Sequence, residues 1–504
     1  MDTQVAADGP LSAVRLIVNG ALWVAATAVI VGWLVLAVIH FRDDYRVTHV
    51  QGVWIAAAEA ARHGQLYPPL FDGEHYAGTR YLPLPILLNA LAAGVAGDPW
   101  VGGKLLAAVL TGILLVLIVC VLRRCSCGWA LAIALAASVV ATDAGLQGGT
   151  TTGGDVLPVV LQLGAVALAL RGRDRFTMMM AGGLAGLAMV SKLTGVWALF
   201  AIVTWLIAQR AWRPASTFAA TAVGTAALIL GVVQIATHGG LSQHLLAFSV
   251  AGVHGGFSLF RAPNQVLFNL LGHAVATVVL LPLALVALLM AVSWRQLTVI
   301  HFAIGYSLLM LLVVYTDIGT GSNQLLDLTV LVALAVGELA GRIRASESRF
   351  QTLSLVVAVT ALWATSLDLV RTVIFDVRRA GAAVSGGRPV QRAAAAVAGL
   401  VGPNDEVFAE DPSIYVAMGR PPLLMDAFML TRLDRTHPQW VDPVVARIAE
   451  RRFDLVVLVV SLEDRSADYW WNDYHLGPRI AEALRRSYRF DRSVGRYYLY
   501  RAAS

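Results

Sequence analysis

Two adjacent carboxylates, Asp43 and Asp44, stand directly after the first long apolar stretch of the chain. A carboxylate within hydrogen-bond reach of a hydroxyl group can take its proton and make it a nucleophile. Neighbouring side chains diverge by about 100° in a helix and face opposite ways in a strand, so only one of the two would do this. We favour Asp44, which is farther from the apolar stretch, over Asp43. His49 is a candidate ligand for a divalent metal ion, although no second ligand stands at the usual spacing from it.

Groups that could hold a phosphate recur along the chain. Only two of the 38 lysines and arginines are lysines, Lys104 and Lys192, and both stand near ends of apolar stretches. Cationic and polar side chains stabilise phosphate oxygens through charge-assisted hydrogen bonds. The candidate substrate- and donor-binding residues are Arg80, Tyr81, Lys104, Lys192 and Asn323, together with Asp155, whose carboxylate would serve the substrate and not the phosphate.

The chain that must position these residues is unusually apolar. Of its 504 residues, 58% are hydrophobic and 14% are charged, whereas a soluble protein is about a quarter charged. This composition excludes a soluble enzyme, a disordered chain and a secreted disulfide scaffold. The net charge is +6, but the basic residues stand mainly at the ends of apolar stretches, so we expect membrane lipid and no nucleic acid as a partner.

Blocks of about 20 apolar residues are long enough to cross a bilayer as helices. The sequence therefore predicts an all-α polytopic membrane protein with about eleven transmembrane helices. These helices are expected near residues 16–40, 101–121, 128–142, 155–170, 177–191, 195–209, 215–236, 266–293, 298–316, 324–341 and 352–375.

The distribution of arginine predicts the orientation of these helices. If the N-terminus is cytoplasmic, the arginine-rich turns all lie inside, as the positive-inside rule requires, whereas loops 143–154 and 317–323 carry no Lys or Arg. An odd number of spans then puts the C-terminus outside. The scarcity of lysine beside abundant Ala and Gly indicates a bacterial genome, and so the plasma (inner) membrane.

Two regions are too polar to be membrane helices. Residues 41–100 form a long first outer loop, with short amphipathic segments near 50–63 and 84–96. Residues 376–504 contain two strand-like runs, two helix-like runs and a terminal hairpin with Gly495 near its turn. We predict two domains, a membrane domain over 1–375 that includes the outer loop, and a small extracytoplasmic α/β domain over 376–504.

Several motifs follow one another on the predicted outer face. An acidic pair opens the long loop, which contains GQLYPP and RYLPLP; GGDVLPVVL, GLAMVSKLTG and GSNQLLDL come later. In this order the chain resembles the GT-C superfamily of glycosyltransferases that use polyprenyl-phosphate sugars. The most similar branch includes protein O-mannosyltransferases and the aminoarabinose transferase of lipid A. Many relatives carry Asp-Glu where this chain has Val50 and Gln51.

The resemblance implies a membrane glycosyltransferase. Such an enzyme would move a hexose or pentose from a polyprenyl-phosphate donor to a lipid, glycan or protein acceptor on the outer face, with inversion. Asp44 or Asp43 would be the base. Lys192, Arg80 and Lys104 would contact the phosphate, and a divalent metal ion could assist.

The carboxylates also have structural alternatives. Asp43 and Asp44 could end the first helix at the water interface, beside Arg42. Asp155 could be the N-cap of the fourth helix.

The other candidates have alternatives of the same kind. Lys192 could snorkel to the interface. Arg80 and Tyr81 could pack within the loop, and Asn323 could cap a turn. The aromatic residues 469–471 could bind a sugar or rest on the membrane.

Two other functions compete with catalysis. A transporter or flippase of a lipid-linked saccharide usually has internal repeats and charges at the bilayer midplane, whereas this sequence shows no repeat. A membrane scaffold whose tail binds a partner would need no carboxylate at a cavity.

Overall fold

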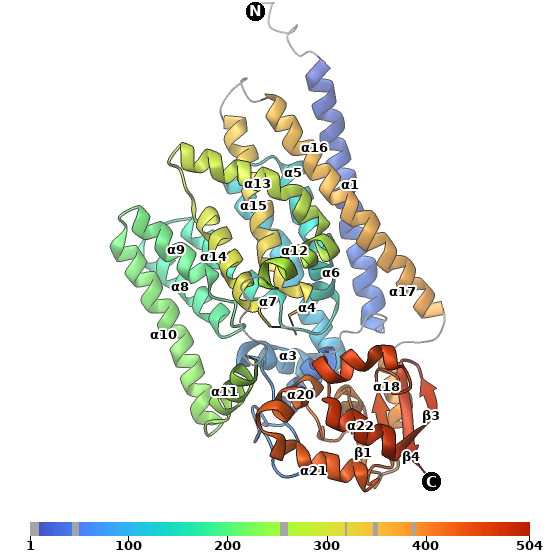
Figure 1. Cartoon of the computed structure of the whole chain (residues 1–504). Helices are drawn as coiled ribbons and strands as arrows, with labels where there is room; N and C mark the ends of the chain where they lie inside the picture. Colours follow the sequence, from blue (N-terminus) through green and yellow to red (C-terminus); the bar gives the residue numbers. More distant parts are fainter. Residues whose placement is uncertain are drawn as a thin grey trace, which may run out of the picture.

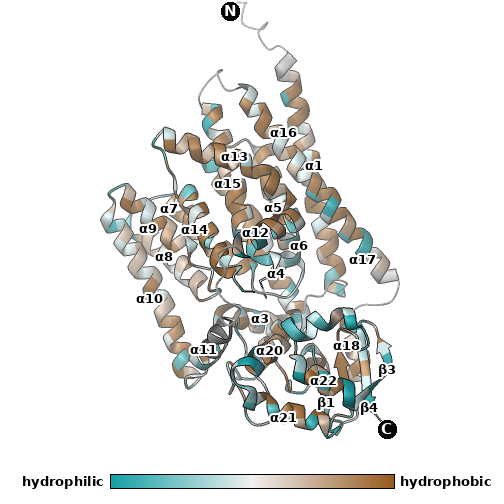
Figure 2. Cartoon of the chain, viewed as in Figure 1, coloured by the Kyte–Doolittle hydropathy of each residue, from teal (hydrophilic) through white to brown (hydrophobic). Residues whose placement is uncertain are grey.

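The computed structural model describes residues 10–42, 50–252, 261–317, 320–345, 351–385 and 390–503. It is a tall bundle of helices with a smaller unit of helices and strands at one end (Figure 1). Hydrophobic residues run along the height of the bundle, and hydrophilic residues gather in the smaller unit (Figure 2). The chain is therefore a multi-pass membrane protein with a small C-terminal sheet, as its composition predicts.

Six helices in the described residues are long and apolar enough to cross a membrane. Their central segments are α1 (Pro10–Arg42), α4 (Pro99–Arg124), α10 (Trp212–Ala236), α13 (Val275–Ser293), α15 (Leu326–Ala345) and α16 (Gln351–Asp368). A seventh span is possible where α5 (Trp129–Ala141) and α6 (Asp143–Thr150) meet at a bend of 77°. The count of eleven spans stays a prediction.

Shorter helices complete the bundle. Four of them are apolar: α3 (Pro83–Ala96), α7 (Val156–Ala169), α9 (Trp197–Ala208) and α14 (Val299–Val314). The others are α2 (Gln51–Arg62), α8 (Arg175–Met189), α11 (Gly240–Gly252), α12 (Arg261–His273), the 3₁₀ turn η2 (Ser322–Leu325), the π-helical turn η4 (Leu369–Ile374) and α17 (Phe375–Ser385).

The structure corrects one predicted span. The apolar stretch 266–293 was expected to be a single helix, but α12 and α13 are separate helices that break at Ala274 (φ −144°, ψ 56°). At the break, the ring of His273 lies 3.1 Å from the Asp143 carboxylate. A polar contact of this kind satisfies a side chain that a continuous apolar helix would leave in lipid.

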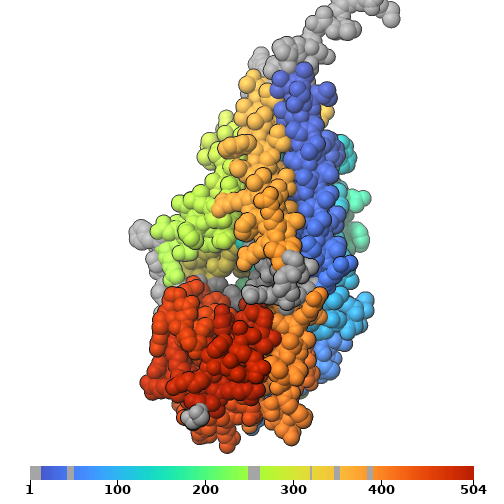
Figure 3. Space-filling view, turned by 90° about the vertical axis from the view of Figure 1, so that its right-hand side faces the viewer, coloured from blue at the N-terminus to red at the C-terminus, as the bar shows by residue number. Residues whose placement is uncertain are grey.

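Close helix packing depends on small residues. The helix α15 is the central element, since 89% of its most apolar 18-residue segment is buried. The helices α8 and α10 meet at Gly182 and Gly186, where a Cβ atom would lie 2.6 and 2.5 Å from backbone oxygens of α10. This small-x-x-x-small spacing lets two helices approach closely in a membrane. In Figure 3, α1 and α16–α17 run side by side above the C-terminal unit.

The C-terminal unit (residues 390–503) is a small α/β layer. Its four strands, in sheet order, are β1 (Val407–Ala409), β2 (Leu455–Leu458), β4 (Tyr497–Ala502) and β3 (Tyr488–Val494). The strands β1 and β2 are parallel, whereas β4 pairs antiparallel with both β2 and β3. The helices are α18 (Val390–Ala398), α19 (Ser413–Met418), α20 (Ala427–Thr436), α21 (Pro438–Ala449) and α22 (Pro478–Ser487), with short turns η5 (Arg465–Ala467) and η6 (Trp470–Tyr474).

Local predictions for this region are confirmed. The two strand-like runs form β1 and β2, the helix-like runs form α18 and α22, and the terminal hairpin turns at Gly495, whose φ of +60° favours glycine. The amphipathic segments of the outer loop are likewise α2 and α3.

The outer loop is joined to the C-terminal unit by backbone hydrogen bonds. Tyr76 N donates to Leu423 O (2.7 Å), and Met425 N donates to Tyr76 O (2.8 Å). The Tyr76 hydroxyl donates to the Trp440 carbonyl at 2.6 Å. These contacts fix the unit over one end of the bundle.

Arginine-rich turns gather at the opposite end, which we call the basic end. Arg342 of α15 donates to the Gln296 carbonyl in the α13–α14 turn at 2.7 Å, and Arg124 donates to the Ala167 carbonyl at 3.1 Å. The N-terminal part of α1 lies at this end, away from the C-terminal unit (Figure 1). Which end faces the cytoplasm stays a prediction.

Candidate active site

A cavity of about 880 Å³ lies where the bundle meets the C-terminal unit. Five charged side chains among the described residues line it: Arg80, Asp155, Lys192, Asp317 and Arg496. Its other wall is apolar and includes Ala107, Leu110, Leu157, Leu193, Val313 and Val314. We call this space the outer cavity, after the face that the sequence predicts for this end of the bundle. Its excess of cations suits an anionic ligand with an apolar part.

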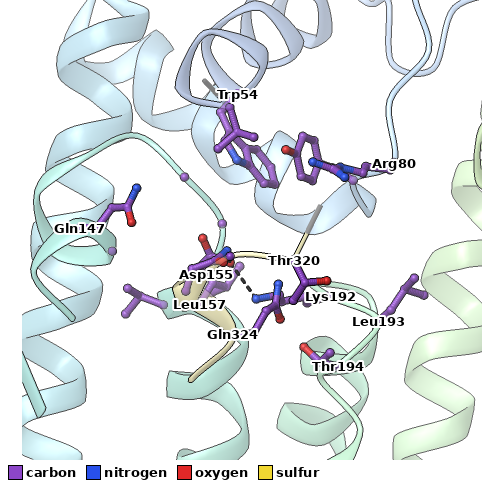
Figure 4. A pocket seen from close by; sticks show the side chains of 18 of the residues that line it. Trp54, Arg80, Gln147, Asp155, Leu157, Lys192, Leu193, Thr194, Thr320 and Gln324 are labelled. Atoms are coloured by element: carbon purple, nitrogen blue, oxygen red, sulfur yellow. Dashed lines mark hydrogen bonds and ion pairs between the residues drawn. The ribbon is translucent and has the colours of Figure 1, made fainter. Parts of the chain in front are cut away.

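Asp155 and Lys192 form an ion pair in the outer cavity. The Lys192 Nζ lies 2.7 Å from the Asp155 Oδ1, and the Asn323 Nδ2 donates to the same oxygen at 2.9 Å. Asp155 stands at the N-cap position of α7, yet its side chain makes no capping hydrogen bond. The carboxylate therefore serves the cavity and not the helix end. Figure 4 shows the pair with Trp54 and Arg80 above it.

Arg80 and Tyr81 belong to an aromatic stack on the outer-loop side. The ring of Tyr81 stacks on Trp54 with centroids 4.0 Å apart. The Arg80 guanidinium lies 4.2 Å from the centroid of Phe428 in α20, so a cation from the loop rests on a ring from the C-terminal unit. Both residues line the outer cavity.

The outer loop around Arg80 is held by buried hydrogen bonds. The Tyr67 hydroxyl donates to the Tyr81 carbonyl at 2.7 Å. His244 of α11 accepts from Thr79 N at Nδ1 (3.2 Å) and lies 2.6 Å from the Pro68 carbonyl at Nε2, which fits a neutral ring that donates from Nε2. Burial lowers the pKa of His244, which agrees with a neutral ring.

Gly154 brings the loop before α7 against the aromatic stack. A Cβ atom at this position would lie 2.7 Å from the Trp54 ring, closer than real Cβ contacts allow. The neighbouring Gly153 has no heavy atom within 4 Å of the same point. Glycine at 154 is therefore a packing requirement of the outer cavity.

The C-terminal unit contributes Trp470 and Arg496 to the wall of the outer cavity. The Trp470 indole N–H donates to Glu410 Oε1 at 2.8 Å, and the His475 Nδ1 lies 2.6 Å from the same oxygen. The other Glu410 oxygen accepts from Val459 N at 2.8 Å. This buried carboxylate thus fixes the plane of the Trp470 ring.

Asp426 lies behind Arg80 at the start of α20. One carboxylate oxygen accepts from Phe428 N at 3.1 Å, and the other has no hydrogen-bond partner in the part of the chain that the structure describes. Burial raises the pKa of Asp426 above its usual value, although Arg80 and His475 oppose the shift. The negative charge of Asp426 therefore attracts the Arg80 guanidinium from behind the outer cavity.

The structure brings together five of the residues that the sequence singles out. Arg80, Tyr81, Asp155, Lys192 and Asn323 all line the outer cavity.

Lys104 is placed differently. It is buried on α4 and does not line the outer cavity, and its Nζ donates to the His40 carbonyl near the end of α1 at 2.7 Å. The predicted phosphate contact of Lys104 stays a prediction.

The candidate bases Asp43 and Asp44 and the candidate metal ligand His49 lie outside the described residues. Within the described residues, no group of three or more His, Cys, Asp or Glu side chains could hold a metal ion. The roles of these three residues stay predictions.

Sequence reasoning missed several residues of the outer cavity. Trp54 and Arg496 carried no motif signal, whereas Trp470 belongs to the aromatic run 469–471. In that run Trp470 lines the outer cavity, Trp471 is buried and Tyr469 is exposed. Asp317 also lines the outer cavity, and it forms an ion pair with Arg432 of α20.

Comparison with solved structures identifies the fold. ArnT from Cupriavidus metallidurans, solved bound to undecaprenyl phosphate, is similar over 94% of this chain and 97% of its own, with 13% identity and a TM-score of 0.59. The apo form of the same protein gives a TM-score of 0.57. The oligosaccharyltransferase of Archaeoglobus fulgidus is similar over 94% of this chain and 74% of its own, with 11% identity and a TM-score of 0.57.

These similarities show that the chain has the GT-C fold, which agrees with the resemblance of its motifs. At such low identity they establish the fold alone. No family model and no curated protein sequence matches the chain.

Proposed function

We propose that the protein is a membrane glycosyltransferase that takes one sugar from a polyprenyl-phosphate donor and transfers it to an acceptor on the outer face. The observation that carries this proposal is the outer cavity, where Lys192, Asp155 and Asn323 form a hydrogen-bonded cluster beside Arg80. The ArnT structure bound to undecaprenyl phosphate supports the choice of donor class.

The two parts of such a donor match the two kinds of wall. Lys192 and Arg80 would contact the phosphate, because cations stabilise the charge that grows on a departing phosphate. The apolar side chains of α4, α7 and α14 would contact the first isoprene units of the lipid. Asp155 would orient the Lys192 ammonium that it binds, and Asn323 would hold the Asp155 carboxylate in place.

The reaction is a displacement at the anomeric carbon. The acceptor oxygen forms a new bond to that carbon, the bond from the carbon to the phosphate oxygen breaks, and the lipid phosphate leaves with the electron pair. A base takes the hydroxyl proton, and one direct displacement inverts the anomeric centre. We assign the base to Asp44, with Asp43 second. Both follow α1, whose end is held by the bond from Lys104 to His40.

The proposed setting is the plasma membrane of a bacterium. Residues 1–375 would form the membrane domain, with the N-terminus in the cytoplasm. Residues 376–504 would form the extracytoplasmic domain, which covers the outer cavity and admits the acceptor.

The test uses the full chain in lipid nanodiscs with undecaprenyl-phosphate sugars that carry a radiolabel in the sugar. We expect label to move to an acceptor fraction while free undecaprenyl phosphate accumulates in equal amount. Lys192→Ala should reduce both products about 10²-fold, which is the usual cost of losing one donor to a developing negative charge.

The matched control is Arg213→Ala, which removes an exposed arginine at the basic end and should leave the rate unchanged. If labelled donor crosses the bilayer of proteoliposomes intact and no free carrier forms in either preparation, the protein is a transporter and the proposal fails.

A further inference from the structure

A second cavity, of about 700 Å³, lies at the basic end, across the bundle from the outer cavity. It is formed by the ends of α7, α9, α13 and α15, the start of α14 and the turn between α13 and α14. We call it the basic-end cavity, and its volume lies within the range of ligand sites in proteins, about 300–1,000 Å³. The residues that line it include Leu170, Trp205, Ala208, Arg295, Phe302 and Arg342.

The two arginines of the basic-end cavity differ in what they contact. Arg342 bonds to the Glu338 carboxylate at 2.6 and 3.2 Å and to the Gln296 carbonyl at 2.7 Å, so its charge is balanced within the protein. The side chain of Arg295 is exposed and makes no hydrogen bond or ion pair to any residue that the structure describes; only its backbone N–H is bonded, to the Val292 carbonyl at 3.0 Å. The cavity therefore presents one uncompensated cation.

Other nearby charges do not cancel the charge of Arg295. Glu338 faces Arg342, the Thr298 hydroxyl at 2.8 Å and the ring of His301 at 3.9 Å. The Arg173 guanidinium does not line the cavity but lies 5.0 Å from the ring centroid of Trp205, which does, so it adds positive charge nearby. An anionic group is favoured at this position, because an unpaired cation beside a buried ion pair attracts negative charge.

Exposed tryptophans at the basic end indicate where the membrane interface lies along the bundle. Trp129, Trp212 and Trp294 stand at helix ends of the basic end and are 56%, 62% and 39% exposed. Exposed tryptophans of this kind sit at the head-group level of a bilayer. Arg295 directly follows Trp294, so it stands at the end of the bundle that these tryptophans mark, while Leu170, Val292 and Phe302 line an apolar space beside it.

We propose that the basic-end cavity binds one anionic phospholipid from the surrounding leaflet. The phosphate contacts Arg295, and the upper part of an acyl chain enters the apolar space between α7, α9 and α13. A phospholipid fits because the cavity combines a cation, which suits its phosphate, with an apolar wall, which suits its acyl chain. The surrounding bilayer supplies such lipids. The proposal is independent of the glycosyltransferase function.

The test is native mass spectrometry of the full chain, released from detergent after incubation with phosphatidylglycerol or with phosphatidylcholine of the same acyl chains. We expect phosphatidylglycerol to be retained about 5-fold more strongly, since one Arg near anionic lipid contributes about that factor. Arg295→Gln should remove this preference. Arg213→Gln changes an exposed arginine outside the basic-end cavity at the same end and should keep it.

Two further arms separate the alternatives. Ala208→Trp places a ring in the basic-end cavity and should reduce retention of phosphatidylglycerol, whatever the state of Arg295. Inorganic phosphate in excess should not displace the lipid. Equal retention of the two lipids, equal effects of Arg295→Gln and Arg213→Gln, unchanged retention in Ala208→Trp, or displacement by phosphate would each overturn the proposal.

Discussion

The two ends of the bundle carry charge in different ways. At the outer cavity, charges are paired across distant parts of the chain: Asp155 with Lys192, and Asp317 with Arg432. At the basic end, several arginines are exposed, such as Arg210 and Arg213, and few carboxylates accompany them. A charge that is partly desolvated needs a partner, whereas an exposed arginine at a membrane surface is stabilised by water and lipid phosphate.

This difference predicts where substitutions will matter. Removal of one member of a partly buried ion pair leaves the other charge without compensation, which costs stability or ligand affinity. Exposed charges are screened by salt within about 10 Å at 0.1 M ionic strength, so the loss of one has a small effect. Catalytic function should therefore be sensitive to charge changes at the outer cavity and insensitive to those at exposed positions of the basic end.

The largest effect is expected at Asp44, which starts the outer loop. Asp44→Asn keeps the size of the side chain but removes the proposed base, so transfer should fall about 10²–10⁴-fold while donor binding persists. Asp43→Asn should cost much less. The measurement is transfer of radiolabelled sugar in membranes, with each variant normalised for its amount. Full activity in Asp44→Asn would move the base to Asp43 and then to Asp155.

The next largest effect is expected at Lys192. Its substitution can be compared directly with that of Arg213 at the basic end. Lys192→Ala should weaken binding of undecaprenyl phosphate about 10²-fold, because Asp155 and the phosphate both lose their cation. Lys192→Arg should restore part of the affinity, since a point-charge contact tolerates this exchange better than a shape-specific one. Isothermal titration in detergent measures each constant, with Arg213→Ala as control. Equal affinity in Lys192→Ala and Arg213→Ala would leave Lys192 as a snorkelling side chain.

Local sequence patterns predicted much of the fold and part of the candidate site. Apolar block length, turn chemistry and alternation predicted α1, α4, α10, α15, α16 and the strands of the C-terminal unit. Motif order on one face predicted that Arg80, Asp155 and Lys192 belong together, and all three line the outer cavity. These predictions succeeded because each rests on neighbouring residues or on a shared membrane face.

Other features depend on how distant parts pack. The break between α12 and α13 depends on a distant partner, since His273 at the break contacts Asp143, which lies 130 residues earlier in the chain. The sequence also does not specify that Lys104 on α4 bonds to the His40 carbonyl at the end of α1 and lies outside the lining of the outer cavity. No local pattern specifies that the C-terminal unit lies over the bundle. This placement is what brings Arg496 to the outer cavity and pairs Arg432 with Asp317.

Gly154 tests whether the outer cavity depends on close packing as well as on charge. Gly154→Ala places a Cβ atom 2.7 Å from the Trp54 ring and should destabilise the fold by about 1–3 kcal/mol, the usual cost of overpacking. Gly153→Ala meets no atom within 4 Å and should stay within about 0.5 kcal/mol of the original protein. Thermal unfolding in detergent compares the two. Equal midpoints would mean that the Trp54–Tyr81 stack adapts freely.

The smallest effect is expected at Trp470, which separates two roles of the C-terminal unit. If the unit only covers the outer cavity, its aromatic wall adds no binding energy to the transfer reaction. If Trp470 contacts a sugar or acceptor, Trp470→Ala should lower kcat/KM about 3- to 10-fold, which corresponds to the 0.5–1.5 kcal/mol of one aromatic contact. Tyr469→Ala is the matched control, since Tyr469 is exposed and does not line the outer cavity. Trp470→Phe keeps a ring but loses the bond to Glu410, so an intermediate rate would show that both the ring and its fixed plane contribute.

Equal rates for Trp470→Ala and Tyr469→Ala would contradict a binding role for Trp470. The C-terminal unit would then only position the outer loop, through Tyr76 and Arg80.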